Sequence, residues 1–226
     1  ALDRTAHRQV ALKILHEEVA RDEVSVERFK REYEVSGQLL HAHIVEVLDF
    51  CPTSDGSHVL VMEFLAGEEL RATLKREKRL EPARVIRLVS QLALALDPAH
   101  ELGFVHRDLK PDNIFLCQTP DGDVVKVLDF GSVKQRGAAK QLTIMGTTIG
   151  SPFYMSPEHA QGSADLDHRA DVWAVNAVAY EALTATLPFV GTNAPSILLN
   201  ILSKDPQPPS RVLESLPKAL DVAVAH

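Results

Sequence analysis

The sequence contains few cysteines and no long apolar segment. Its 226 residues include two cysteines, Cys51 and Cys117, and neither belongs to a CxxC pair or a group of metal-ligating residues. This usage indicates a reducing compartment, so we expect a cytoplasmic chain, with any membrane anchor outside it. The apolar stretches 88–96 and 172–180 fall well short of the ~18 residues that a membrane-spanning helix needs. We therefore expect no membrane segment within this chain.

The chain also has no excess of basic residues. The chain has 24 Lys and Arg against 31 Asp and Glu, which gives a formal net charge of -7 at pH 7. Nucleic acids and anionic membranes are bound by basic surfaces, so this balance predicts no nucleic-acid partner. With 45% hydrophobic and 24% charged residues, the composition is that of a folded globular chain, long enough for one large domain or two small lobes.

The first part of the chain is rich in predicted strands. The segment 8–15 contains β-branched and aliphatic residues typical of a strand, and 22–40 has apolar residues at helical spacing among many charges. The segments 44–50 and 58–65 are apolar and flank the turn-rich 51–57, which predicts an antiparallel hairpin. A sheet with one amphipathic helix is the expected result.

After residue 66 the pattern changes to helices. The segment 82–103 begins with a proline, carries a wide apolar face and ends at a glycine, which predicts a long buried helix. Two short strands are predicted at 113–116 and 124–128, followed by helices at 168–186 and 194–202. The fold class is therefore α+β, with a sheet-rich lobe at 1–66 joined near residues 63–68 to a larger helical lobe at 67–226.

One stretch between the two halves is dense in charge. Residues 104–115 read FVHRDLKPDNIF. One explanation is a polar turn, which Pro111 would mark, and this accounts for the polarity of the stretch but not for the order of its charges. Phosphoryl transfer explains the order of the charges as well, because it needs a base, a cation near the moving phosphate and oxygen ligands for Mg²⁺. Asp108, Lys110 and Asn113 supply these three types in that order.

From His106 to Asn113 the chain resembles the HRDxKxxN catalytic loop of eukaryotic-like protein kinases. The resemblance implies a bilobal kinase-like fold, ATP and Mg²⁺ as cofactors, Asp108 as base, Lys110 as a phosphate-binding cation and Asn113 as a metal ligand. Lys110 followed by Pro111 is similar to the serine/threonine class, which implies proteins with Ser or Thr as substrates. The segments MSPE and ALKIL resemble bacterial members.

Lys13 and Glu32 extend the resemblance toward the N-terminus. A lone lysine in a strand is more often a solvated edge charge, but VALK ending at Lys13 is similar to the family's VAIK motif, whose lysine holds the α- and β-phosphates. Glu32 could be a surface partner of a neighbouring helical charge. The segment 39–45, LLHAHIV, resembles the family's LxHPNIV, and counting back from it selects Glu32, not Glu34, as the glutamate that pairs with Lys13.

The resemblance also implies a nucleotide site. LDFG places Asp129 where the family has its second Mg²⁺ ligand. In VMEFL, Met62 would be the gatekeeper, and backbone groups of Glu63 and Leu65 would meet the adenine edge, although a plain hydrophobic strand end explains these residue types equally well. The expected cofactor-binding residues are Ala11, Lys13, Met62, Glu63, Leu65 and Phe115.

Further motifs follow in the family's order. SPFYMSPEHA resembles the substrate-docking loop and APE-like motif, here residues 156–158, with Ser151 where threonine is usual. Asp171 resembles the aspartate that braces the backbone of the catalytic loop from beneath. A scaffold with the same fold and no turnover is the alternative function. A small-molecule phosphotransferase is a second one, and it would not need the peptide-docking residues 143–158.

Arg107, beside the expected base, needs an anion, yet residues 130–157 contain no Asp or Glu. Phosphorylation in this loop would supply one, and resemblance to bacterial kinases favours Thr143, with Thr147 and Thr148 close behind. The simpler alternative is that Arg107 pairs with a carboxylate elsewhere or faces solvent, and that the threonines are ordinary loop residues.

One family feature is missing from this sequence. No glycine precedes Lys13, where the family has a GxGxxG loop that donates backbone N–H groups to the phosphates. The chain opens with Ala1 and stops within an apolar-periodic stretch, so we expect both ends to be cut and the glycine loop to lie upstream.

Overall fold

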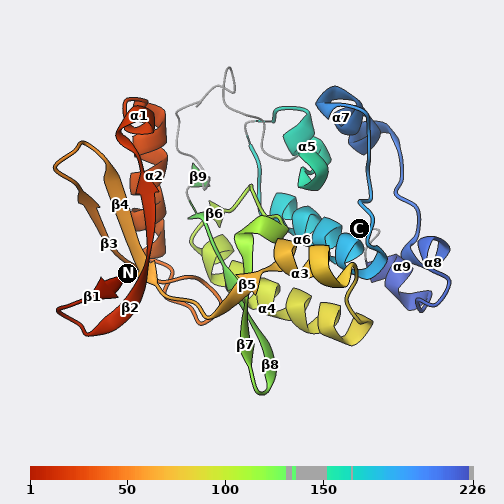
Figure 1. Cartoon of the computed structure of the whole chain (residues 1–226). Helices are drawn as coiled ribbons and strands as arrows, with labels where there is room; N and C mark the ends of the chain where they lie inside the picture. Colours follow the sequence, from red (N-terminus) through yellow and green to blue (C-terminus); the bar gives the residue numbers. More distant parts are fainter. Residues whose placement is uncertain (131–133, 136–151, 164, 224–226) are drawn as a thin grey trace.

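The computed structural model describes residues 1–130, 134–135, 152–163 and 165–223. They form a smaller lobe of antiparallel strands with one long helix and a larger, mostly helical lobe, with the N-terminus in the first and the C-terminus in the second (Figure 1). This is the α+β, two-lobed organisation that the sequence predicts. Within the described residues, no helix has both the length and the apolar character needed to cross a membrane.

The smaller lobe is a four-stranded antiparallel sheet in the order β1-β2-β4-β3. Its strands are β1 (Leu2–Asp3), β2 (Arg8–Leu15), β3 (Val47–Pro52) and β4 (His58–Glu63). Successive side chains of a strand point to opposite faces. In β2, Leu12 and Ile14 are exposed, whereas Lys13 lies on the opposite face together with Ala11. The predicted phosphate-binding lysine therefore points to the inner face of the sheet.

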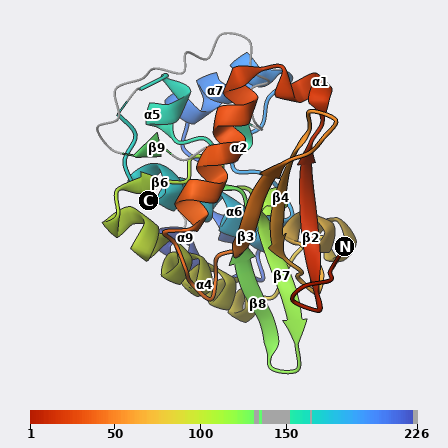
Figure 2. The same ribbon diagram turned by 90° about the vertical axis from the view of Figure 1, so that its left-hand side faces the viewer.

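Two helices follow β2, the short α1 (Glu17–Ala20) and α2 (Glu23–Ser36). The side chain of Asp22 caps α2 by accepting two backbone N–H groups of its first turn. Buried positions recur at helical spacing along α2, and Phe29 packs with Val47 and Leu60 in a small apolar cluster. Figure 2 shows α2 running alongside the strands of this lobe.

The described part of the larger lobe contains seven helices, two small sheets and two 3₁₀ turns. Its helices are α3 (Leu70–Glu77), α4 (Pro82–Glu101), α5 (Pro157–Ala160), α6 (Arg169–Thr184), α7 (Ala194–Ser203), α8 (Pro209–Val212) and α9 (Ala219–Ala223). Its strands and 3₁₀ turns are β5 (Gly67–Glu69), β6 (Phe104–Val105), β7 (Ile114–Thr119), β8 (Gly122–Val127), β9 (Lys134–Gln135), η1 (Pro111–Asn113) and η3 (Pro152–Tyr154). The sheets are antiparallel, in the orders β5-β7-β8 and β6-β9.

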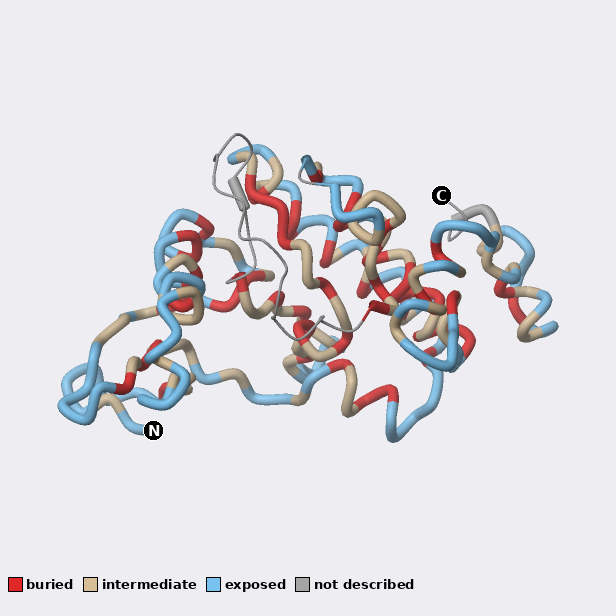
Figure 3. The backbone as a smooth tube through the Cα atoms, turned by 90° about the horizontal axis from the view of Figure 1, so that it is seen from above, coloured by how far each residue is buried: buried red, intermediate tan, exposed pale blue. Residues whose placement is uncertain are grey.

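Helix α4 contributes one side of the apolar core of the larger lobe. Pro82 occupies its first turn, where the fixed φ of proline is already helical and its missing N–H has no partner to lose. Buried residues spaced along one side, from Val85 to Ala99, join the main apolar core with α6. Buried segments gather in the centre of the larger lobe, while the strands near the N-terminus are mostly exposed or intermediate (Figure 3).

The connection between the lobes runs close to β7. Gly67 of β5 pairs with Cys117, and a Cβ at this glycine would lie 2.0 Å from the carbonyl oxygen of Leu116. Only glycine permits so close an approach of two backbones. The first residues of the larger lobe are therefore held directly against the hairpin that follows the HRD loop.

The structure corrects two details of the predicted elements. The strand predicted over 44–50 begins only at Val47, because Ile44 and Val45 pair instead with Val127 of β8 in the other lobe. Helix α3 is absent from the prediction, because its eight residues offer too short an apolar period. The first difference arises where the two lobes meet.

Candidate active site

The HRD loop, residues 106–113, begins directly after β6 and ends with η1, and a buried carboxylate fixes its backbone. Asp171 of α6 has no exposed surface, and its oxygens accept the backbone N–H groups of His106 (2.8 Å) and Arg107 (2.9 Å). The ring of His100 on α4 also bonds Asp171, at 2.8 Å. Three donors from two elements thus meet one carboxylate beneath the loop.

Asp108 lies within a small polar group on this loop. Its Oδ2 is 2.7 Å from Nζ of Lys110 and 3.2 Å from Nδ2 of Asn113. Asn113 Nδ2 also donates to the backbone carbonyl of Asp108, at 2.7 Å. The predicted base, cation and metal-binding amide are therefore in mutual contact, and the orientation of the Asp108 carboxylate is set by both neighbours.

A second polar group joins the two lobes. Lys13 Nζ lies 2.7 Å from Oε2 of Glu32 on α2 and 3.2 Å from Oδ2 of Asp129. The ammonium also lies 5.8 Å from the centre of the Phe29 ring. Three residues that are far apart in the sequence thus form one line of charges that connects the two lobes, in the order Glu32, Lys13, Asp129.

Burial gives this line unusual electrostatics. Glu32 is 2% exposed, and burial together with the charge of Asp129 raises its pKa to about 7, against the opposing effect of Lys13. Burial alone would lower the pKa of Lys13, but the charges of Asp129 and Glu32 outweigh it and raise that pKa. The contribution of Glu32 to stability is therefore complete below its ordinary pKa and is lost as the pH rises toward 7.

We expect Asp129→Asn to lower the pKa of Glu32, because the charge of Asp129 is the second cause of its elevation. Burial would keep it above its ordinary value. The measurement is a ¹³C NMR titration of the Glu32 side-chain carboxyl, assigned by its loss in Glu32→Gln. Asp49→Asn, at an exposed position of β3, is the control and should leave the titration unchanged. An unaltered Glu32 titration in Asp129→Asn would contradict the proposed coupling.

Two residues next to the site have a left-handed backbone. Arg107 has φ of 68° and Asp129 has φ of 61°, a region that non-glycine residues rarely adopt. Such conformations cost on the order of 1–3 kcal/mol each and persist where surrounding contacts hold them. For Arg107 that contact is the Asp171 carboxylate on its N–H group.

The HRD loop and the segment before Asp129 also hold each other. The Leu128 N–H donates to the carbonyl of Asn113, at 2.9 Å, and the His106 ring bonds the carbonyl of Leu128, also at 2.9 Å. Phe130 is buried and meets the His106 ring edge-on, with ring centres 4.8 Å apart. The polar groups around Asp108 and around Asp129 are therefore parts of one site.

The residues present fit a Mg²⁺ ion that is bound together with a nucleotide. Asn113 uses its amide nitrogen on Asp108, which leaves its amide oxygen for a ligand. The side chain of Asp129 is 40% exposed and so remains accessible. Mg²⁺ is bound by one or two such oxygens, with water and substrate phosphates completing its shell. No cluster of three or more His, Cys, Asp or Glu side chains suited to a metal occurs in the described part of the chain.

The residues expected to bind the adenine lie along the connection between the lobes. Ala11 of β2 is opposite Met62 of β4, and Met62 packs against the small apolar cluster. The Glu63 N–H donates to the carbonyl of Glu46, at 3.0 Å, so only the carbonyl of Glu63 remains for a nucleotide. Leu65 is half-buried just before β5. Phe115, also half-buried, lies in β7 opposite Glu69.

Arg107 is half-buried and poorly paired. Within the described residues its Nη2 makes one long bond, 3.4 Å, to the carbonyl of Leu166, and its buried Nε has no partner. Burial lowers the pKa of Arg107, against the charges of Asp171 and Asp165. Thr143, Thr147, Thr148 and Ser151 lie outside the described residues.

Sequence reasoning missed a further polar group beside the site. Arg71 of α3 bonds Tyr154, 83 residues away, and Glu181, 110 residues away. No local pattern marks such a group, because each residue taken alone is an ordinary polar residue of its element. His100, on the buried side of α4, was missed for the same reason.

Comparison with known proteins identifies the family of this chain. Residues 1–218 match the family described as protein kinase domain. The serine/threonine-protein kinase pkn3 of Myxococcus xanthus is 42% identical over 206 residues, which cover 89% of this chain and 38% of that protein. The serine/threonine-protein kinase PknB of Mycobacterium leprae is 36% identical over 227 residues, covering 99% of this chain and 36% of that protein. The chain thus spans little more than a third of these relatives.

The two-lobed fold, the HRD loop and the Lys13–Glu32 pair define a protein kinase domain, and the chain belongs to the protein kinase family. Within that family, its relatives are serine/threonine-protein kinases of bacteria, and the predicted eukaryotic-like kinase domain of bacterial type is confirmed.

Proposed function

We propose that this domain transfers the γ-phosphoryl group of Mg²⁺-ATP to Ser or Thr hydroxyls of proteins. The observation that carries the proposal is the position of Asp108, held by Lys110 and Asn113 in the same site as the Glu32–Lys13–Asp129 line. Bound Mg²⁺ would supply positive charge at the phosphates, with Asn113 and Asp129 as its protein ligands.

The residues have distinct proposed roles in the reaction. Asp108 orients the acceptor hydroxyl and takes its proton. The hydroxyl oxygen forms a bond to the γ-phosphorus, while the bond between the γ-phosphorus and the bridging oxygen of the β-phosphate breaks and ADP is released. Lys110 lies beside the transferred group, and Lys13 holds the other phosphates. Glu32 fixes the position of Lys13. Ala11, Met62, Glu63, Leu65 and Phe115 are proposed to surround the adenine.

The test is transfer of ³²P from γ-labelled ATP to a general Ser/Thr acceptor protein by the full-length protein. We expect label on Ser or Thr, dependent on Mg²⁺. A scaffold without turnover is the competing proposal, and the presence of every predicted catalytic side chain in this site argues against it. Lack of transfer to any acceptor, with nucleotide still bound, would favour the scaffold.

We further propose that Arg107 binds a phosphate on the loop that follows Asp129. Its buried, unpartnered Nε supports this role, because an arginine fork suits phosphate. After incubation with ATP, mass spectrometry should find phosphate on Thr143, Thr147 or Thr148, with Thr143 first. A variant with alanine at all three threonines should lose most of its activity. Arg107→Gln should also lose most of its activity, although its loop should still be phosphorylated. Thr119→Ala, at the end of β7, is the control. Full activity in the triple variant would refute the proposal.

A further inference from the structure

Arg71, at the start of α3, joins three other elements of the larger lobe. Its Nη1 lies 2.7 Å from Oε1 of Glu181 on α6, and its Nε lies 3.2 Å from Oδ2 of Asp112 in η1. Its Nη2 donates to the hydroxyl of Tyr154 in η3, at 2.5 Å. The Tyr154 hydroxyl in turn donates to the second carboxylate oxygen of Glu181. We call these four residues the Arg71 cluster.

The Arg71 cluster lies between the HRD loop and the segment expected to dock substrates. Asp112 immediately precedes Asn113, the amide that contacts Asp108. Tyr154 belongs to the described end of the SPFYMSPE segment. Since Arg71 contacts both, it links the loop that carries the base to the segment that would hold the acceptor protein.

Burial makes the contacts of this cluster strong. The side chains of Arg71 and Glu181 are 22% and 13% exposed, and Tyr154 is buried. Burial would lower the pKa of Arg71, but its bonds to Tyr154 and Glu181 outweigh this and raise it. Burial, and then Glu181, raises the pKa of Tyr154, so its hydroxyl keeps its proton and remains a donor.

The cluster also determines whether the carboxylates of Asp112 and Glu181 are available to bind basic side chains of an acceptor protein. Asp112 lies on the loop that carries the proposed base, and it shares the guanidinium of Arg71 with Glu181. Two carboxylates around one guanidinium are the kind of site that could also bind an arginine of a partner. In this protein one of its own arginines already occupies both. A basic side chain of an acceptor protein would have to displace Arg71 to reach them.

We propose that Arg71 is a positioning and specificity-determining residue, which holds the Tyr154 segment against the HRD loop and closes the Asp112–Glu181 pair to basic side chains of acceptor proteins. The inference rests on the proposed kinase function. It predicts that the wild-type protein does not favour acceptors with arginine near the phosphorylated residue, and that removing the guanidinium creates this preference.

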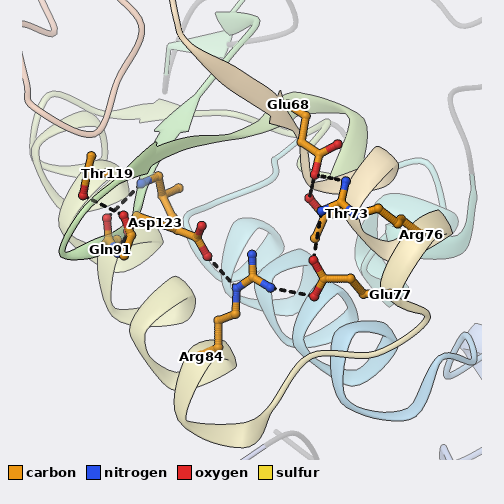
Figure 4. Close-up of polar contacts among 10 residues, drawn as sticks. Glu68, Thr73, Arg76, Glu77, Arg84, Gln91, Thr119 and Asp123 are labelled. Carbon is orange, nitrogen blue, oxygen red and sulfur yellow. Dashed lines mark hydrogen bonds and ion pairs between the residues drawn. The ribbon is translucent and has the colours of Figure 1, made fainter.

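The variants are Arg71→Met and Arg71→Lys, with Arg76→Met as the matched control. Arg76 lies on the same helix and is 53% exposed. It bonds Glu68 and Glu77, and this chain of charges continues through Arg84 to Asp123 on β8 (Figure 4). Arg76→Met therefore removes a two-carboxylate arginine from α3 without touching the HRD loop or Tyr154.

Binding is measured first, by fluorescence anisotropy with two peptides that contain one Ser and differ only in having arginines or glutamines around it. Arg71→Met should bind the arginine peptide about 10-fold more tightly than the wild type does, the gain expected from one charge-assisted pair. Arg71→Lys should show a smaller gain, and Arg76→Met none. Because it needs no turnover, this measurement holds even if the proposed phosphoryl transfer fails.

Kinetics and hydrogen exchange complete the test. In Arg71→Met, KM for the glutamine peptide should rise while KM for ATP stays constant, since no residue proposed to bind the nucleotide belongs to the Arg71 cluster. The Met155 amide, which donates to the carbonyl of Pro152, should exchange faster in Arg71→Met and not in Arg76→Met. Unchanged peptide preference with unchanged Met155 exchange would overturn the proposal while leaving the kinase function intact. A thermal melt of each variant identifies general loss of folding.

Discussion

Replacing Asp108 with asparagine is expected to lower kcat by roughly 10²- to 10⁴-fold, the usual range for a positioned proton transfer. Asparagine has the same shape and can still accept the hydrogen bond of Lys110, so the loop should keep its geometry. In the proposed mechanism it would lose the ability to take the proton of the acceptor hydroxyl. The affinity for nucleotide should change little, because Asp108 contacts neither Lys13 nor the connection between the lobes.

The measurement is single-turnover transfer of labelled phosphate by the full-length protein, with a fluorescent nucleotide used to follow binding. Asp121→Asn, on the exposed turn between β7 and β8, is the matched control and should be as active as the wild type. A near-normal rate of transfer in Asp108→Asn would show that another group accepts the proton. Lost nucleotide binding would instead indicate a damaged fold.

Much of this site could be predicted because its residues belong to short local sequence motifs. Asp108, Lys110 and Asn113 lie within one short loop, so their mutual contacts follow from a tight turn of the chain. Lys13 and Glu32 are farther apart, but the strand and helix that carry them have clear periodicities, and their pairing at 2.7 Å agrees with the expected register. Their roles in catalysis remain predictions.

Other features depend on contacts that no local pattern encodes. The segment around Ile44 is apolar enough for a strand of the small sheet, yet it pairs with Val127 of the other lobe. The Arg71 cluster unites four elements whose sequence positions give no sign of their proximity. The connection between the lobes gives a further example: the N–H of Glu63 is bonded to the carbonyl of Glu46, so the carbonyl of Glu63 is the group that remains for the proposed contact with adenine. In each case tertiary pairing decides where a polar group is satisfied.

Replacing Asp171 with alanine is expected to lower the free energy of unfolding by about 3–5 kcal/mol, the range for removing one partner of a buried charged group. The carboxylate has no exposed surface and accepts the N–H groups of His106 and Arg107 as well as the His100 ring. Alanine would leave two backbone donors buried without acceptors. It would also remove the contact that holds Arg107 in its left-handed conformation.

Urea unfolding of the wild type and of the Asp171→Ala variant measures this loss, and Asp167→Ala is the matched control. Asp167 also accepts from a backbone N–H, that of Arg169, but its partner side chain is 79% exposed, so its removal should cost only about 1 kcal/mol. Since a domain of this kind is stable by only about 5–15 kcal/mol, the Asp171 variant should unfold at distinctly lower urea. If both variants unfolded at the same urea concentration, Asp171 would not be the brace of the HRD loop.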